Sequence, residues 1–589
     1  MCQGKSAPVV RGLAALSLAL SACGSPSAPL PKPVAAPAPS AARDGWTEFA
    51  ERFIESSFHA DPFFAAQAGR HEFDGQMPDW SAPGLSAEVA RLHALRAEAQ
   101  AFDAAALNES ARLEREIVLT VIDGNLFWLE RVQSPFTNPA FYLEQLDPDV
   151  YLNRDYAPLA KRMRGYIGYL RAIPKIAADI RANLRTPLPP SFAQRGIDDF
   201  GGYVEFFRKD GPKVFASVQD DAAQRDLAQA SAAAADAMAG LRKWFQRERA
   251  HATGRFALGE PLFLEMLRAT ERVEVPIAQL LEVGRADLER NTQALTAACT
   301  QYLPGGTLRA CVERMRADKP AGGAVEGARA QLGQLREFIV ARRIVTIPSA
   351  DRPEVAEAPA YNRSNAAYIN IPGPYEKGVA YTYEIAPPDP AWSAKERADY
   401  IPGKASLLYT SVHEVWPGHF LQFLYSNRNP SKILALWVGY AYAEGWAHYC
   451  EEMMWEEGLG NGDAEQHIGQ LTDALLRDVR YLSAIGLHTQ GMTLAESDRM
   501  FRERAYTDPG NARQQAARGT YDPEYLKYTL GKLMIRKLRT DWIAANPAAV
   551  AADPSPQKWQ TFHDKFLSYG GPPIPVLRKQ MVGEGGSLF

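Results

Sequence analysis

The chain has 589 residues, enough for several domains or one large two-lobed enzyme and too many for a single small binding module. Its 65 Lys and Arg nearly balance 69 Asp and Glu, so the net charge of −4 lacks the basic excess typical of nucleic-acid binding, and we expect no nucleic-acid partner. With 46% hydrophobic and 23% charged residues, the composition is that of a globular protein and excludes wholesale disorder.

The first 23 residues are typical of a bacterial export signal. A positively charged start precedes residues 12–22, a largely apolar run too short to span a bilayer. This run ends in Leu-Ser-Ala-Cys, which is similar to a lipobox, the site where a cysteine is diacylated. We therefore expect a signal peptide over 1–23, lipidation at Cys23, and a Pro- and Ala-rich tether over 24–43. A plain secretory signal with a chance cysteine is the alternative.

The location follows from this signal. No later segment has eighteen consecutive apolar residues, so only the lipid anchor is expected to hold the protein to a membrane. We expect a periplasmic body in the cell envelope, anchored at the outer membrane. Residues 44–343 are predicted to form a helical N-terminal half, because apolar residues recur there at three- and four-residue spacing.

Three cysteines remain in the exported body. Cys299 and Cys311 flank a Pro-Gly-Gly turn between two predicted helices, which favours a disulfide in an oxidising compartment. Two unpaired cysteines are the alternative. Cys450 lies in an apolar helical segment and is predicted to be a small buried hydrophobe.

The second predicted half covers residues 344–589, and its first part no longer shows the helical spacing of apolar residues. The runs IVTIPS, AAYINIP and VAYTYEIAPP are short, rich in β-branched or aromatic residues, and bounded by Pro or Gly, which predicts a small sheet. Helical patterns resume at Lys404 and continue to about Ala545, with one more helix near the C-terminus. The expected fold is therefore mainly α, with a small β-sheet preceding the most informative helix.

That helix contains the segment SVHEVWPGHFLQFL. A His-Glu pair followed by another His indicates a zinc site, with the two His as ligands and the Glu as general base. His413 and His419 are six residues apart, however, which on an unbroken helix would separate them by about 120° and about 9 Å. Pro417 and Gly418 can break the helix and bring the two side chains together. The metal site and the base Glu414 therefore depend on that break.

A third metal ligand is expected on the next helix. Glu444 follows His419 by twenty-five residues, in the segment GYAYAEGWAHYCEEMMWEE. Glu451 lies seven residues further on the same face and could orient a ligand histidine. His448 is a rival ligand. The alternative for the whole set is partly exposed histidines and surface carboxylates.

Two of these motifs resemble a known family. HEVWPGHFLQ followed by AEGWAHYCEE is similar to the bacterial domain-of-unknown-function family 885, exported zinc-peptidase-like lipoproteins that resemble gluzincin metallopeptidases. The resemblance implies a large helical fold with a deep cleft, one Zn²⁺ on His413, His419 and Glu444, and Glu414 as general base. Related chains often carry a second His where this one has Phe420.

Further catalytic groups are predicted downstream. A donor for the developing oxyanion is expected from Tyr528, with Tyr525 second, or from His488. Arg480 or Lys532 could bind a substrate carboxylate. For each residue alone, an ordinary capping or ion-pairing role is the alternative.

The expected function is that of an exported zinc-dependent metallopeptidase that hydrolyses short peptides with a metal-activated water. Two alternatives stay open. One is a non-catalytic periplasmic binding or scaffold lipoprotein. The other is a metal-dependent hydrolase of non-peptide amides or esters, because such a metal site is not specific to one reaction.

Overall fold

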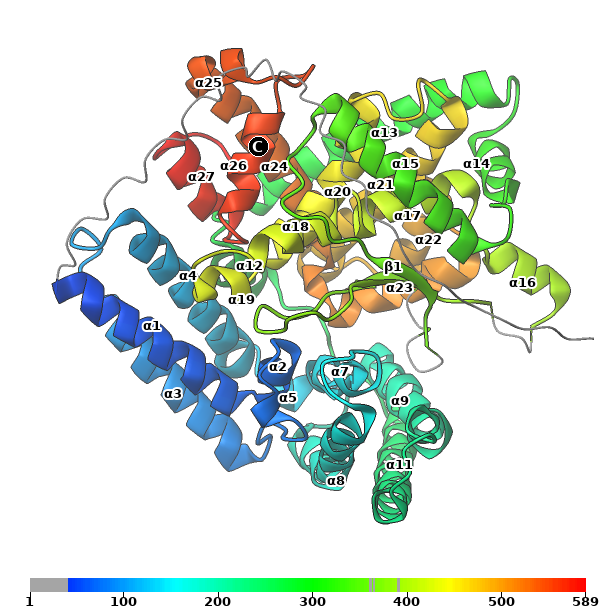
Figure 1. Cartoon of the computed structure of the whole chain (residues 1–589). Helices are drawn as coiled ribbons and strands as arrows, with labels where there is room; N and C mark the ends of the chain where they lie inside the picture. The colour runs from blue at the N-terminus through cyan, green and yellow to red at the C-terminus, as the bar shows by residue number, and fades with distance from the viewer. Residues whose placement is uncertain (1–40, 360–362, 364–365, 389–391) are drawn as a thin grey trace, which may run out of the picture. The chain divides into compact units, whose positions relative to one another are not determined.

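The computed structural model describes residues 41–359, 363, 366–388 and 392–589 (Figure 1). The predicted signal peptide, the lipidation site Cys23 and all but the last residues of the tether lie outside this part. Ala42–Phe589 forms one compact unit. The division at residue 343 stays a prediction, and the largest hydrophobic core takes side chains from both sides of it, including Leu280 and Leu471.

Helices make up the part of the unit that precedes the sheet, as the apolar spacing predicts. Their starts follow the sequence: Ser81, Asn108 and Asp220 each accept a backbone N–H bond at a helix N-terminus. The helices are α1 (Ala41–Ala60), α2 (Pro62–Gln67), α3 (Ala82–Ala101), α4 (Glu109–Leu126), α5 (Ser134–Thr137), α6 (Ala140–Leu143), α7 (Asp149–Leu152), α8 (Leu159–Asn183), α9 (Pro190–Glu205), α10 (Gly211–Val214), α11 (Asp221–Arg249), α12 (Glu260–Glu271), α13 (Ile277–Tyr302), α14 (Leu308–Ala317) and α15 (Ala324–Arg342).

A three-stranded sheet follows, in the order β1-β3-β2, with β1 parallel and β2 antiparallel to β3. The strands are β1 (Glu354–Glu357), β2 (Ala367–Asn370) and β3 (Thr382–Ile385). The runs AAYINIP and VAYTYEIAPP supply β2 and β3. The prediction of a strand in IVTIPS is wrong: β1 comes later, and Ile344 and Thr346 instead bond to His563 and Asp564.

Helices resume after the sheet and hold the metal-binding motifs. They are α16 (Ala394–Tyr400), α17 (Lys404–Glu414), α18 (His419–Ser426), α19 (Lys432–Leu436), α20 (Tyr440–Glu456), α21 (Ala464–Thr489), α22 (Leu494–Arg504), α23 (Pro509–Tyr521), α24 (Lys527–Ala545), α25 (Pro547–Ala552), α26 (Gln560–Ser568) and α27 (Ile574–Val582). Short 3₁₀ or π turns connect some helices, at η1 (His71–Phe73), η2 (Phe127–Arg131), η3 (Glu144–Leu146), η4 (Phe206–Asp210) and η5 (Pro523–Leu526).

Close helix packing fixes the position of the motifs. α20 packs along α24, and α17 contacts both α20 and α21 (Figure 1). α20 and α24 approach backbone to backbone, because a Cβ on Gly445 would lie 2.5 Å from the Cα of Gly531. Only glycine allows this contact, so the crossing holds Glu444 at a fixed depth.

Two further expectations concern cysteines and the membrane. Cys299 and Cys311 are joined by a disulfide between α13 and α14, and Cys450 is free and buried. Within the described ranges, no helix combines the length and the apolar character that crossing a membrane requires.

Candidate metal centre

The break between α17 and α18 is the local feature that makes the site. α17 ends at Glu414 and α18 begins at His419, so the helix is broken at Pro417 and Gly418, as the sequence predicts. The N–H of Gly418 donates to the carbonyl of Val412 at 3.0 Å. A Cβ on Gly418 would lie 1.8 Å from the carbonyl oxygen of His413, so only glycine can occupy this position.

α20 holds this break in place. The indole N–H of Trp446 donates to the carbonyl of Pro417 at 2.9 Å. The rings of His413 and His419 consequently lie 4.8 Å apart between centroids and nearly perpendicular. The sequence spacing of six residues is thus compatible with one metal ion.

Three ligand atoms converge. Glu444 Oε2 lies 3.3 Å from His413 Nε2 and 3.4 Å from His419 Nε2, and all three ligand atoms are within 4.8 Å of one another. A tetrahedral zinc ion with bonds of about 2.0–2.1 Å keeps neighbouring ligand atoms about 3.3–3.4 Å apart. Glu444 Oε2 is buried and makes no hydrogen bond within the described part of the chain. The residues present therefore fit a divalent ion such as zinc.

Glu451 contacts the first ligand where the sequence analysis expects it. The Nδ1–H of His413 donates to Glu451 Oε1 at 2.6 Å, which leaves Nε2 to face Glu444. Arg477, which the sequence analysis missed, binds the same carboxylate at 3.0 Å, and His448 Nδ1 lies 3.2 Å from its other oxygen. Burial opposes the ionisation of Glu451, but Arg477 and His448 outweigh it and hold its pKa far below the ordinary value.

The charges around His413 favour a cation. Burial and Arg477 both lower the pKa of His413, yet the carboxylates of Glu444 and Glu451 outweigh them and raise it to about 9. Burial also opposes ionisation of Glu444, but His419 and His413 hold the pKa of this carboxyl well below its usual range. The centre is thus an anionic pair of carboxylates around two imidazoles, which is a suitable environment for a metal dication.

A cavity of about 740 Å³ opens onto these groups, and we call it the metal chamber. His413, Glu414, His419 and Glu444 line it. Its other walls come from β2 and from the N-terminal part of the chain, including Phe64, Asp149 and Arg154. Burial raises the pKa of Glu414, as suits a carboxylate that must accept a proton.

Tyr528 lies beside His413, and its role as an oxyanion donor stays a prediction. Its ring is 6.3 Å from that of His413 and 5.9 Å from that of Tyr440, and both tyrosines line the metal chamber. Burial raises the pKa of Tyr528, so its hydroxyl keeps its proton at neutral pH. Arg480 does not line the chamber; its guanidinium lies 5.2 Å from the ring centre of Tyr528 and donates to Gln515.

Four other predicted groups lie away from the chamber. His488 Nε2 donates to the carbonyl of Gly519 at 2.7 Å, while its Nδ1 accepts the N–H of Leu258 at 3.3 Å, so both ring nitrogens are used. The other three side chains are fully buried. Lys532 forms an ion pair with Asp287, and His448 lies beside the carboxylate of Glu451. Tyr525 packs next to Gly519. These positions support structural roles for the four groups and correct the catalytic, substrate-binding and rival-ligand predictions.

The family assignment rests on most of the chain. The family of bacterial proteins of unknown function DUF885 matches residues 62–581. The chain belongs to this family. No curated protein matches this chain.

Two solved structures share the fold of this DUF885 protein. A candidate lipoprotein of unknown function from Shewanella oneidensis is 23% identical, with 91% of this chain and 99% of that chain covered and a TM-score of 0.74. A candidate lipoprotein from Colwellia psychrerythraea is 18% identical, with 92% and 99% covered and a TM-score of 0.76. A carboxypeptidase from Pyrococcus furiosus is 12% identical, with 82% of this chain and 97% of that chain covered and a TM-score of only 0.30.

The DUF885 chamber contains two groups that the sequence analysis missed. Tyr440 lies four residues before Glu444, so helical periodicity alone places it on the same face and could have identified it. Arg518 lines the chamber from α23 and pairs with Asp522 at 2.8 Å. No spacing in the sequence connects Arg518 with the metal-binding helices.

Proposed function

We propose that this protein is an exported, zinc-dependent metallopeptidase. The convergence of His413, His419 and Glu444 beside Glu414 on one chamber is the observation that carries this proposal. Catalytic zinc sites commonly use two imidazoles and one carboxylate as protein ligands and leave one position open. The chamber would give water or a substrate access to that open position.

Zinc in this position would polarise a carbonyl and make a bound water more acidic. The chain's own residues would then move the protons. Glu414 would accept a proton from the attacking water on its carboxylate and return it to the leaving amine. Tyr528, whose hydroxyl stays protonated, would donate to the oxygen of the reacting carbonyl.

An edge strand favours a peptide over other amides or esters. β2 pairs with β3 on one side, and no other described strand pairs with its second edge. Residues of β2 line the metal chamber, and β2 contacts α17, which carries His413. An extended peptide could hydrogen-bond to the backbone of this edge, and a compact ester could not use it in the same way.

The proposal includes the cell envelope as the location. Both solved relatives are described as candidate lipoproteins, and the sequence around Cys23 is similar to a lipobox. We infer lipidation at Cys23 and an outer-membrane anchor that leaves the chamber in the periplasm.

Metal analysis together with peptide hydrolysis tests the proposal. The purified protein should hold one zinc per chain and cleave mixed short peptides. A His413→Ala/His419→Ala variant should lose both, whereas a His93→Ala/His251→Ala control, which changes two exposed histidines, should keep both. A zinc-free parent would overturn the proposal, and a zinc-loaded but inactive parent would favour the binding-protein alternative.

A further inference from the structure

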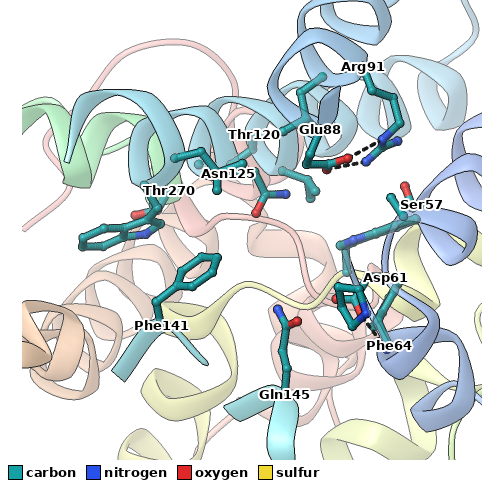
Figure 2. Close-up of a pocket in the computed structure, with 18 of the residues that line it drawn as sticks. Ser57, Asp61, Phe64, Glu88, Arg91, Thr120, Asn125, Phe141, Gln145 and Thr270 are labelled. Carbon is teal, nitrogen blue, oxygen red and sulfur yellow. Dashed lines mark hydrogen bonds and ion pairs between the residues drawn. The ribbon is translucent and has the colours of Figure 1, made fainter. Parts of the chain in front are cut away.

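A second cavity, of about 800 Å³, lies next to the metal chamber, and we call it the second chamber (Figure 2). Phe64 and Tyr440 line both cavities, so the two share these side chains as a wall. Tyr440 also stacks edge-to-face on Tyr528 of the metal chamber. Each cavity alone has the volume of a small-ligand site.

The second chamber has an excess of negative charge. Five carboxylates line it, against the two cations Arg91 and Lys527: Asp61, Asp79, Glu88, Glu271 and Glu524. Glu88 pairs with Arg91, and Lys527 is shared between Glu271 and Glu524. Asp79 pairs with Lys175, which lies outside the lining, at 2.9 Å.

Asp61 has no cationic partner within the described part of the chain. Its Oδ1 accepts the N–H of Phe64 at 3.0 Å, the bond drawn in Figure 2. Burial, with a smaller contribution from the charge of Glu88, raises the pKa of Asp61 to about 6. A positively charged ligand would therefore find an uncompensated carboxylate here.

Two buried acceptors in the same wall lack a donor. Gln145 Oε1 makes no hydrogen bond in the described part of the chain, and Figure 2 shows this side chain directed into the chamber. Glu271 is 1% exposed, and its Oε2 also lacks a hydrogen bond there, although Oε1 binds Lys527 and the N–H of Ala441. Buried acceptors without a partner are costly, so both indicate a ligand that brings donors.

The rest of the wall is largely apolar. Aromatic side chains, among them Phe53, Trp128, Phe141 and Trp437, line the chamber. Such walls suit a hydrocarbon stem and can also contact a cation through the ring faces.

We propose that the second chamber binds a cationic amine carried on an apolar stem, and that in the peptidase it holds the amine-bearing part of the substrate. The amine is either the amino terminus of a peptide or a lysine side chain. The assignment to a substrate rests on the proposed function, whereas the binding of the amine does not.

Equilibrium binding tests the chamber without any turnover. The probes are 2-phenylethylamine and its neutral analogue 2-phenylethanol, titrated into the purified protein and followed by calorimetry. The amine should bind at least about tenfold more tightly than the alcohol, a difference of about 1.4 kcal/mol, because only the amine can form a charge-assisted hydrogen bond with a carboxylate. Equal binding of the two probes would overturn the proposal.

Two variants locate the site. Asp61→Asn removes the charge but keeps a good helix cap for α2, so the fold should survive. Gln145→Leu removes the unpartnered acceptor at similar volume. Each should weaken amine binding about tenfold. The exposed controls Asp226→Asn and Gln293→Leu should not change it. Unchanged affinity in both Asp61→Asn and Gln145→Leu would contradict the assignment.

Hydrolysis then separates the two sources of the amine. If the amino terminus binds, N-acetylation of a peptide should raise its KM about tenfold in the parent but not in Asp61→Asn. If a lysine side chain binds, acetylation of that lysine should instead raise the KM about tenfold in the parent but not in Asp61→Asn. If neither modification changes KM, the amine-bearing part of the substrate is not held here. If the parent binds the amine but cleaves no peptide, the proposed peptidase function is wrong, whereas the assignment of the second chamber as an amine site still holds.

Discussion

Replacing Glu451 tests whether the metal centre depends on a residue that would not itself bind the metal. Glu451 is fully buried and contacts three groups: His413 Nδ1 at 2.6 Å, Arg477 at 3.0 Å and His448 at 3.2 Å. Glutamine at this position can still accept the proton of His413, but it loses the negative charge. Alanine loses both.

The expected loss follows from these contacts. Zinc affinity should fall about 10-fold in Glu451→Gln and about 100-fold in Glu451→Ala, the range found when the partner of a ligand histidine is removed. The free energy of unfolding should fall by about 3–5 kcal/mol, because the buried charge of Arg477 loses its closest carboxylate. Competition with a zinc chelator measures the affinity, and unfolding in urea measures the stability.

A second substitution separates the two effects. Arg477→Met added to Glu451→Gln removes the uncompensated charge, so it should restore part of the stability but not the zinc affinity. Glu503→Gln, an exposed control, should change neither quantity. Zinc affinity within twofold of the parent in Glu451→Gln would contradict the positioning of His413 by Glu451.

Three further predictions concern packing, pH and the anchor. Gly531→Ala should destabilise the protein in urea and displace Glu444, because the new Cβ would lie 2.0 Å from the carbonyl of Ala441; Gly240→Ala, which points into open space, should not. Burial lowers the pKa of His563 to about 3, so its neutral form contributes stability that is complete above about pH 6.5 and is lost as the pH falls toward 3, by about 1.4 kcal/mol per pH unit. His563→Gln should reduce the slope of urea-measured stability against pH between pH 6 and 4, although His448, His467 and His488, whose pKa values burial also lowers to about 4, keep part of it. An unchanged slope would contradict this assignment. A Cys23→Ala form with a different export signal should leave the membrane fraction as a folded protein, and sedimentation with membranes would place the anchor elsewhere.

The metal ligands could be predicted because their signals are local. His413, Glu414 and His419 lie within seven residues, and Pro417 with Gly418 supplies the reason for their unusual spacing. Glu444 and Glu451 are seven residues apart on one helix, so periodicity alone puts both on the same face. Pro417 and Gly418 also predict the break, but the hydrogen bond between Gly418 and Val412 that shapes it depends on the folded backbone.

Residues whose partners are distant in sequence could not be assigned in this way. From the sequence alone, Lys532 is a candidate substrate-binding cation. The structure shows that it pairs instead with Asp287, which lies 245 residues earlier in the chain. His488 is used by Gly519 and Leu258, and IVTIPS bonds to α26 where a strand was expected. In each case a long-range contact, which no local pattern encodes, decides between a structural and a functional role.

The exchange Glu414→Gln is the sharpest test of the proposed peptidase mechanism. Glutamine keeps the shape of the side chain but cannot accept a proton, and Glu414 is not among the three predicted ligands. Zinc content and melting temperature should therefore match the parent, while hydrolysis of short peptides falls by about 10²–10⁴-fold. Loss of zinc together with activity would make Glu414 a ligand, and hydrolysis at the rate of the parent would contradict its role as the base.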